Sequence, residues 1–331
     1  MHESSWGANA APAAEPISIE EVLAARDRIA GSALRTPLVR LELEHGPADI
    51  HLKLESLQPI GSFKIRGAAN VMAQADPARL AQGVYTASAG NMAQGVAWNA
   101  RRLGVPCTSV VPETAPEAKL AAIRRLGADY VKAPFDEWWQ VMVDHRYEPL
   151  ADRVFVHPFR DPQVMAGNGT IALEILEDIP DVDAVIVPYG GGGLSCGIAS
   201  ALRALRPEAK VFASEVETAA PLAASLEAGR PVPVPYTPSF VDGIGSKALL
   251  DEMWPLASSI LAGSLVVSLE ETAAAIRLLV ERNRVVAEGA GATSVAAALT
   301  GRAGSGKVVC VISGGNIDPA KLATILTGEL P

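Results

Sequence analysis

The chain has 331 residues, of which 49% are hydrophobic and 20% charged, and this length and composition predict a well-buried globular protein with two domains. Its 28 Lys and Arg against 37 Asp and Glu give a formal charge of −9, which argues against nucleic acid or an anionic membrane as a partner. No apolar run approaches the roughly 20 residues of a membrane span, and the first residues lack the features of a signal peptide. We therefore expect a cytoplasmic protein with no membrane partner.

Short apolar runs alternate with longer helical patterns along the chain. The expected strands are Ile50–Glu55, Gly83–Ala87, Cys107–Val111, Asp129–Lys132, Val154–Val156, Ala184–Pro188, Lys210–Ser214 and Lys307–Ile312. The expected helices are Phe63–Ala75, Gln94–Leu103, Pro116–Leu126, Thr170–Ile179, Leu194–Leu205, Leu269–Arg282 and Ala292–Leu299, after a first helix that Ser18 and Glu21 open with a capping box. Strands that are apolar throughout are typical of parallel sheets covered on both faces. The sequence therefore predicts an α/β fold with two open, twisted, mostly parallel sheet domains covered by helices.

The domain boundaries follow from composition and from a local repeat. Residues 1–16 are rich in Ala and Pro and are expected to form a flexible tail. Two compact strand–loop–helix repeats lie between Gly83 and Val131, as a small inserted α/β domain would have. We expect residues 75–159 to form this small domain, and residues 17–74 together with 160–331 to form the large one.

The cysteines and histidines give little sign of a metal or disulfide site. Three cysteines, Cys107, Cys196 and Cys310, are too few and too scattered for a disulfide framework. Each lies in an apolar segment, so we expect buried free thiols, as in a reducing cytoplasm. No histidine has the spacing to a carboxylate that zinc hydrolases use, which argues against metal-dependent hydrolysis.

The first motif that could carry chemistry is Gly61-Ser-Phe-Lys-Ile-Arg-Gly-Ala68, which places Lys64 among small and apolar neighbours. Burying an ammonium group is unfavourable, so a desolvated lysine has a lowered pKa. Its neutral amine can attack a carbonyl and form a Schiff base. The alternative is a surface lysine that opens a helix with an apolar face of Ile65, Ala68, Ala69 and Met72.

The second motif is the loop from Thr86 to Gly95, which lies between an expected strand and an expected helix. It presents the Ser88 hydroxyl, successive backbone N–H groups and the Asn91 amide at a helix N-terminus, where a carboxylate can bind. An ordinary capped helix start would explain the same residues.

The third motif, Tyr189-Gly-Gly-Gly-Gly-Leu194, also follows a strand and precedes a helix. Its four glycines, Gly190, Gly191, Gly192 and Gly193, let the backbone approach an anion closely. Their N–H groups and the helix N-terminus can together bind a phosphate without any basic side chain.

The same loop is also compatible with a dinucleotide site. Gly190-x-Gly192-x-x-Ser195 comes near the Gly-x-Gly-x-x-Gly fingerprint, and Glu215 lies roughly where a ribose-binding carboxylate would be. An NAD-type dehydrogenase therefore remains an alternative on this segment, although it leaves Lys64 and the other motifs unexplained.

The fourth motif, Ser313-Gly-Gly-Asn316, places a hydroxyl at the carboxyl edge of a sheet, where ligands of open α/β folds bind. A simple turn is the alternative. Taken together, the four motifs supply an amine, a carboxylate site, a phosphate site and a hydroxyl. Pyridoxal phosphate needs an amine for its aldehyde, donors for its phosphate and a partner for its ring nitrogen, while an amino-acid substrate needs the carboxylate site.

These four motifs resemble those of the fold type II (tryptophan synthase β-like) pyridoxal-phosphate enzymes, in the threonine/serine dehydratase and serine racemase branch, from about Ile17 onwards. The resemblance implies that pyridoxal phosphate lies in the cleft between the two domains. It makes Lys64 the catalytic lysine that carries the cofactor, and Phe63, Asn91, Gly190–Leu194 and Ser313 the other cofactor-binding residues. It assigns the substrate carboxylate to the loop of Ser88, Ala89, Gly90 and Asn91. His157-Pro-Phe and Gly167–Glu174 also look like family segments.

The chain departs from the family pattern at several positions. Ala89 stands where serine racemases carry the second serine, the base on the opposite face, so elimination is favoured over racemisation. Met92 replaces the usual histidine and Gly289 the usual proline. Pro221 stands where part of the branch has an aspartate that binds a divalent cation, so no metal is expected although Glu215 and Ala219 match.

The resemblance thus implies a dehydratase, or ammonia-lyase, that removes water from a hydroxy amino acid of the L-threonine or L-serine class. The products would be a 2-oxo acid and ammonia. A serine racemase is the main alternative, and a dehydrogenase or a catalytically silent binding protein are the others. We expect a homodimer, as is common in the family. Because the sequence ends at Pro331, we expect no regulatory domain and no feedback by isoleucine.

Overall fold

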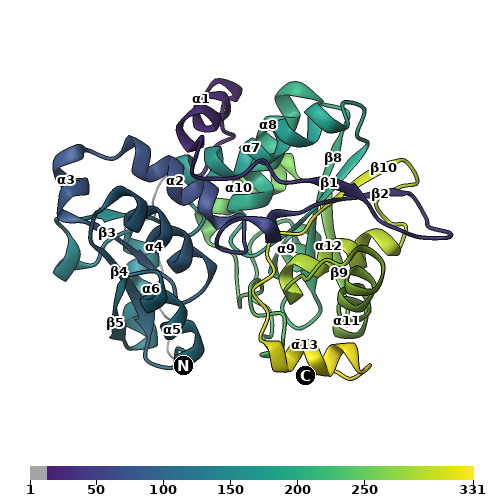
Figure 1. The fold of residues 1–331 in the computed structure, drawn as a ribbon. Coiled ribbons are helices and arrows are strands. Elements are labelled where there is room, and N and C mark those ends of the chain that lie inside the picture. Colours follow the sequence, from purple (N-terminus) through teal and green to yellow (C-terminus); the bar gives the residue numbers. More distant parts are fainter. Residues whose placement is uncertain (1–12) are drawn as a thin grey trace.

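The computed structural model describes residues 13–331, whose strands form a six-stranded and a four-stranded sheet (Figure 1). The larger sheet has the order β1 (Leu38–Arg40), β2 (Asp49–Lys53), β10 (Lys307–Val311), β7 (Ala184–Pro188), β8 (Lys210–Val216) and β9 (Gly263–Val267). The smaller sheet has the order β5 (Asp129–Ala133), β4 (Cys107–Pro112), β3 (Val84–Ala87) and β6 (Val154–Phe155). All neighbouring pairs are parallel except β1 with β2. The α/β fold with mostly parallel sheets is therefore confirmed.

Helices cover both faces of the larger sheet. One face packs against α1 (Ile19–Ile29), α7 (Pro162–Asp178), α8 (Gly193–Leu205), α9 (Pro221–Ala228) and α10 (Trp254–Ile260). The other packs against α11 (Leu269–Leu278), which continues into η4 (Leu279–Asn283), and against α12 (Gly289–Leu299) and α13 (Pro319–Leu326). Burial on both faces explains why these strands are apolar throughout.

The smaller sheet has its own helices, which lie together on the left of Figure 1. These are α3 (Pro77–Gln82), α4 (Asn91–Leu103), α5 (Glu117–Arg125) and α6 (Phe135–Asp144), and α2 (Lys64–Gln74) packs beside α4 and α7. Short helical turns occur at η1 (Glu55–Leu57), η2 (Glu148–Leu150) and η3 (Asp251–Met253). The strands of the smaller sheet all fall between residues 84 and 155, and the proposed domain boundaries themselves stay a prediction.

The expected tail lies mostly outside the described residues. Within them, the Ala14 N–H donates to the Glu252 carbonyl at 2.8 Å, and the Ile17 N–H donates to the Ser200 hydroxyl at 3.1 Å. Residues 13–331 contain no helix with the length and hydrophobicity needed to cross a membrane.

Helix α7 begins at Pro162, eight residues earlier than the sequence predicted. Asp161 caps it by accepting the Gln163 N–H at 2.7 Å. Glycines have a low helix propensity, but here they allow α7 to pack closely against its neighbouring helices. A Cβ at Gly167 would lie 2.6 Å from the Arg66 carbonyl oxygen in α2. On the other side, a Cβ at Gly197 of α8 would lie 2.3 Å from the Met165 carbonyl oxygen. The helices α2, α7 and α8 therefore pack backbone against backbone.

The cysteines and the two neighbouring tryptophans of α6 differ in burial. The three cysteines are buried and free, as expected. Trp138 and Trp139 are only partly buried and line the cavity described below. Their helix, α6, lies at the edge of the smaller sheet's core rather than inside it.

Candidate active site

The residues that the sequence assigns to catalysis, cofactor binding and substrate binding all line one cavity of about 560 Å³. From the larger sheet come the loops that follow β7 and β10, with Gly190–Leu194 and Ser313. From the smaller sheet comes the loop that follows β3, with Ser88, Ala89, Gly90 and Asn91, while Phe63 and Lys64 begin α2. Within each sheet, parallel strands bring their carboxyl ends to one edge, and the loops at these two edges line the same cavity.

Lys64 lies in the first turn of α2, and its amine is reachable from the cavity. The Nζ donates a hydrogen bond to the Pro158 carbonyl oxygen at 2.6 Å and lies 5.1 Å from the centre of the Phe63 ring. Burial lowers the pKa of Lys64 from 10.5 to about 8, against the opposing effect of the nearby Glu288 carboxylate. With this pKa about a tenth of the amine is neutral at pH 7, far more than at an ordinary lysine. Lys64 is not a surface lysine.

The Pro158 carbonyl group, which accepts the hydrogen bond from Lys64, lies in a turn that His157 stabilises. The sequence did not reveal this role of His157. The His157 Nδ1 accepts the N–H groups of Phe159 at 3.2 Å and of Arg160 at 2.9 Å, so its Nε2 carries the proton and donates to the Met142 carbonyl oxygen at 3.2 Å. Burial lowers the pKa of His157 well below 6.5, which keeps the ring neutral. This buried imidazole therefore shapes the turn that contacts both Lys64 and the glycine loop.

The glycine loop forms the N-terminus of α8. Gly192 is the N-cap residue with φ +87°, a conformation that favours glycine, and no side chain caps the helix. A Cβ at Gly191 would lie 2.3 Å from the Phe159 ring, and one at Gly193 would lie 2.3 Å from the Phe159 carbonyl oxygen. Gly191 and Gly193 therefore have no room for side chains, and the N–H groups at this helix start are suited to an anion.

A second helix that begins at a glycine lies on the side of the smaller sheet. Gly90 is the N-cap residue of α4, and the Ser88 hydroxyl accepts the Gly90 N–H at 3.1 Å. The Ser109 hydroxyl in turn donates to the Ser88 carbonyl oxygen, which holds the loop in place. Met92 points into the core beside α4 and is 1% exposed.

Glu288 is a site residue that the sequence did not single out. The Asn91 Nδ2 donates to both of its carboxylate oxygens, at 2.9 and 3.1 Å, and the Asn316 Nδ2 donates to the Asn91 Oδ1 at 2.8 Å. Ser313 lies nearby, 3% exposed, and lines the same cavity. Burial raises the pKa of Glu288 from 4.5 to about 7, although the Asn91 hydrogen bond opposes the rise. Glu288 therefore changes charge near neutral pH.

This raised pKa predicts a pH dependence of stability in the protein freed of cofactor. Because the folded state binds the Glu288 proton more tightly than the unfolded state, that stabilisation is complete below about pH 4.5 and is lost as pH rises through about 7. Glu288→Gln has no such loss. Its free energy of unfolding should rise by up to about 3 kcal/mol relative to wild type across this interval, as urea titrations at successive pH values would measure. Parallel pH curves for the two proteins would contradict this prediction. The lowered pKa of Lys64 affects the free energy of unfolding in a separate pH range, above about pH 8.

Glu215 lies at the end of β8 and is used as a helix cap. Its Oε1 accepts the Leu222 N–H at 2.9 Å, and its Oε2 accepts the Ala223 N–H at 2.8 Å and the Ser264 hydroxyl at 2.6 Å. These three donors, two at the start of α9 and one in β9, occupy the carboxylate that the dehydrogenase alternative assigns to a ribose. That assignment is therefore not supported.

Removing the Glu215 carboxylate should destabilise the fold. Glu215→Ala leaves the Leu222 and Ala223 N–H groups without their acceptor, so the free energy of unfolding should fall by about 1–3 kcal/mol. Urea denaturation would measure the loss. Glu208→Ala, at an exposed carboxylate, is the control and should change stability by less than about 0.5 kcal/mol. Equal stability of the two variants would refute the capping role.

The expected absence of a divalent cation stays a prediction, and unfolding temperatures with Mg²⁺ or EDTA would test it.

Comparisons with known proteins agree with this geometry. Residues 29–314 match the family model described as "Pyridoxal-phosphate dependent enzyme". The L-threonine ammonia-lyase of Geobacter sulfurreducens is 44% identical over 308 residues, which cover 91% of this chain and 76% of the relative. Among solved structures, the T.th. threonine deaminase has a TM-score of 0.83 at 36% identity, covering 91% of this chain and 99% of that one. Maize serine racemase has a TM-score of 0.85 at 30% identity, covering 95% and 98%. The chain therefore belongs to the family of pyridoxal-phosphate-dependent enzymes.

Proposed function

We propose that this protein is a pyridoxal-phosphate-dependent ammonia-lyase that removes water from L-threonine or a related β-hydroxy amino acid and releases a 2-oxo acid and ammonia. Relatives at 36–44% identity carry the names L-threonine ammonia-lyase and L-threonine dehydratase. The dehydrogenase alternative finds no support, since the matching family uses a different cofactor.

One arrangement carries the proposal. The Lys64 amine shares its cavity with the N-termini of α4 and α8, whose N-cap residues are both glycines and so have no side chain of their own to cap the helix. One helix start suits a phosphate and the other suits a carboxylate, so the cavity matches a phosphorylated aldehyde together with an amino acid. No basic side chain is needed for either anion.

The residues present fit pyridoxal phosphate. Lys64 would hold its aldehyde, Gly190–Leu194 its phosphate, and Ser313 its ring nitrogen, with Phe63 against the ring and Asn91 at its hydroxyl. When bound, the cofactor withdraws electrons from the bond that the substrate must break. The close packing of Gly191 and Gly193 on Phe159 supports the phosphate assignment, because only a bare backbone leaves its N–H groups open there.

The chain's own residues would then act on the substrate in turn. The N–H groups of the Ser88–Asn91 loop bind the substrate carboxylate and thereby orient the Cα–H bond. The Lys64 Nζ, freed when the substrate amine takes its place and neutral in part because burial lowers its pKa, would take the Cα proton. It would then give this proton to the β-hydroxyl, which leaves as water, and hydrolysis of the released enamine by water would yield the 2-oxo acid and ammonia.

Release of 2-oxo acid from a panel of L-threonine, L-serine and bulkier β-hydroxy amino acids tests the proposal. We expect turnover of at least one member, with 2-oxobutyrate as the product from L-threonine. No 2-oxo acid from any member, in protein loaded with cofactor, would leave a catalytically silent binding protein as the better description.

A serine racemase is the second candidate, favoured by the likeness to the maize enzyme. Racemisation needs a group that delivers a proton to the opposite face of the substrate, and the Ala89 methyl group cannot do so. D-serine should therefore form from L-serine much more slowly than pyruvate. A D-serine rate that rivals the pyruvate rate would reverse the choice.

We also propose that the protein is a cytoplasmic homodimer with a large domain of residues 17–74 and 160–331 and a small domain of residues 75–159. The location of the four parallel strands of the smaller sheet within residues 84–155 supports this division.

A further inference from the structure

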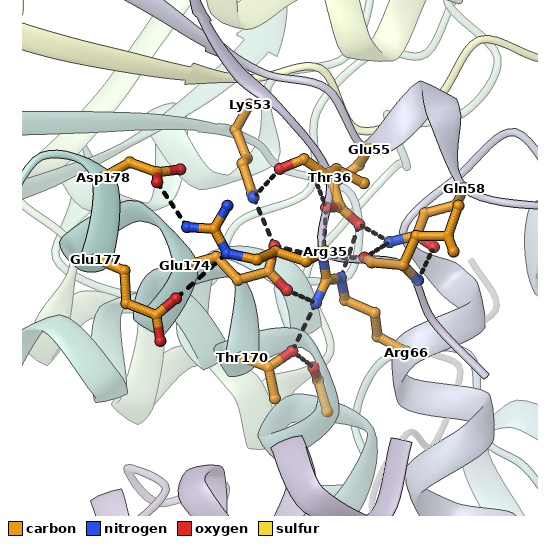
Figure 2. Close-up of polar contacts among 12 residues, drawn as sticks. Arg35, Thr36, Lys53, Glu55, Gln58, Arg66, Thr170, Glu174, Glu177 and Asp178 are labelled. Carbon is orange, nitrogen blue, oxygen red and sulfur yellow. Dashed lines mark hydrogen bonds and ion pairs between the residues drawn. The ribbon is translucent and has the colours of Figure 1, made fainter. Parts of the chain in front are cut away.

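Four charged side chains are buried together behind the first turn of α2. Lys53, Glu55, Arg66 and Glu174 are 0%, 0%, 1% and 9% exposed, and we call them the buried ionic cluster. Figure 2 shows them converging from β2, the turn η1, α2 and α7. Two positive and two negative charges balance, so the cluster as a whole is neutral.

Arg66 is the centre of this cluster and uses its whole guanidinium group. Its Nε and Nη2 donate to the two Glu55 oxygens, each at 2.8 Å, as a bidentate pair. Its Nη1 and Nη2 donate to the two Glu174 oxygens at 2.6 and 2.9 Å, and Nη1 also donates to the Thr170 hydroxyl at 3.0 Å. One side chain of α2 is thus fixed in direction against η1 and α7 at once.

Lys53 and Thr36 complete the arrangement (Figure 2). The Lys53 Nζ donates to Glu174 at 2.5 Å and to the Thr36 carbonyl oxygen at 2.6 Å, while the Thr36 hydroxyl donates to Glu55 at 2.6 Å. Apolar side chains of equal volume commonly give as much stability as a buried ion pair. Directional hydrogen bonds, however, fix the elements that they join in one relative position.

The packing of α2 shows why such a constraint matters. Its contacts with α7 and α4 pass through glycines: a Cβ at Gly67 would lie 2.8 Å from the Val164 side chain, and one at Gly95 would lie 3.1 Å from the Lys64 carbonyl group. The side chains of α2 that pack there, Ala68, Val71 and Met72, are apolar, and apolar contacts have no preferred direction, whereas hydrogen bonds do. Lys64 lies two residues before Arg66, so any slide of α2 moves the amine.

We propose that Arg66 is a positioning residue. Its bidentate hydrogen bonds to Glu55 and Glu174 fix where α2 lies along its own axis, and they thereby place the Lys64 amine in the cavity. The proposal rests on the proposed role of Lys64. It predicts that the geometry of the guanidinium group matters beyond its charge, because an ammonium group cannot make the two bidentate contacts.

The test compares Arg66→Lys with Arg35→Lys in the protein loaded with pyridoxal phosphate. Arg35 is a matched control, since it lies next to the cluster in Figure 2 but is half exposed and binds Glu177 and Asp178 at 3.3 and 2.6 Å. We expect Arg66→Lys to lower kcat on the order of 10²-fold with little change in KM, as a small displacement of a reacting group does. Arg35→Lys should have the kcat and KM of the wild type.

A second readout does not depend on turnover. The visible absorbance of the lysine-bound cofactor is titrated against pH, and its midpoint should shift in Arg66→Lys but not in Arg35→Lys. An Arg66→Lys protein with wild-type kcat and midpoint, and only a lower unfolding temperature, would overturn the proposal and leave the cluster a purely structural feature.

If Arg66→Lys does not fold, Glu55→Gln replaces it, because it keeps the shape of the acceptor and removes its charge. A wild-type midpoint in that variant overturns the proposal equally. If wild-type protein releases no 2-oxo acid, the proposed function has failed, and the absorbance titration still decides whether Arg66 places Lys64.

Discussion

Replacing Lys64 with alanine should lower kcat for 2-oxo acid release by about 10²- to 10⁴-fold and remove the visible absorbance of the purified protein. Both effects have one physical cause. The Lys64 Nζ is an amine that lines the cavity with a pKa lowered to about 8, so it can both bind an aldehyde and take a proton. Initial rates and an absorbance spectrum, taken after incubation with pyridoxal phosphate, measure the two losses.

The control for this experiment is Lys132→Ala, at an exposed lysine of β5 outside the cavity. It should keep the rate and the spectrum of the wild type. A Lys64→Ala protein that keeps its absorbance would show that another amine holds the cofactor, and the assignment of Lys64 would then be wrong.

Replacing Gly193 with alanine should weaken pyridoxal phosphate binding by about 1–3 kcal/mol, or roughly 10- to 100-fold in Kd. The added methyl group would lie 2.3 Å from the Phe159 carbonyl oxygen, which is backbone and cannot rotate away. The start of α8 must therefore shift, and its N–H groups lose their alignment on the phosphate. A titration of the cofactor-free protein, followed by absorbance, gives the Kd.

Gly190→Ala in the same loop provides the comparison. A Cβ there meets its nearest atoms, in Ile244, at 3.6 Å, which is ordinary van der Waals contact. It should weaken binding less than Gly193→Ala does. Equal losses at the two positions would mean that the glycines are required for some reason other than packing on Phe159.

Much of the fold and of the cavity lining could be predicted because it depends on local patterns. Apolar strands followed by glycine or serine loops and then helices predict parallel sheets, and parallel strands bring such loops to one edge. The loops at Gly190 and Ser313 therefore lie at one edge of the larger sheet, and the loop at Ser88 lines the same cavity from the smaller sheet, although up to 225 residues separate their members in sequence.

What could not be predicted depends on contacts between distant segments. Glu288 is a lone carboxylate before a run of small residues, and its meeting with Asn91 has no local signal. Arg66 and Glu174 look like exposed charges by composition, yet each is buried because the other is there to pair with it. The early start of α7 was missed because propensity counts Gly167 and Gly169 against a helix, whereas close packing requires them.

The glycine contacts of α7 have a consequence for how this enzyme could change. Gly167 and Gly197 make two close backbone contacts, of α7 with α2 and of α8 with α7, so α7 fixes the distance between the helix that carries Lys64 and the helix that begins at the glycine loop. Selection for a new substrate could therefore remodel Trp138, Trp139 or Met142, which line the cavity from α6, without altering that distance. The side chains that contact a substrate can thus change, while the packing of α2, α7 and α8 that fixes the reactive groups stays the same.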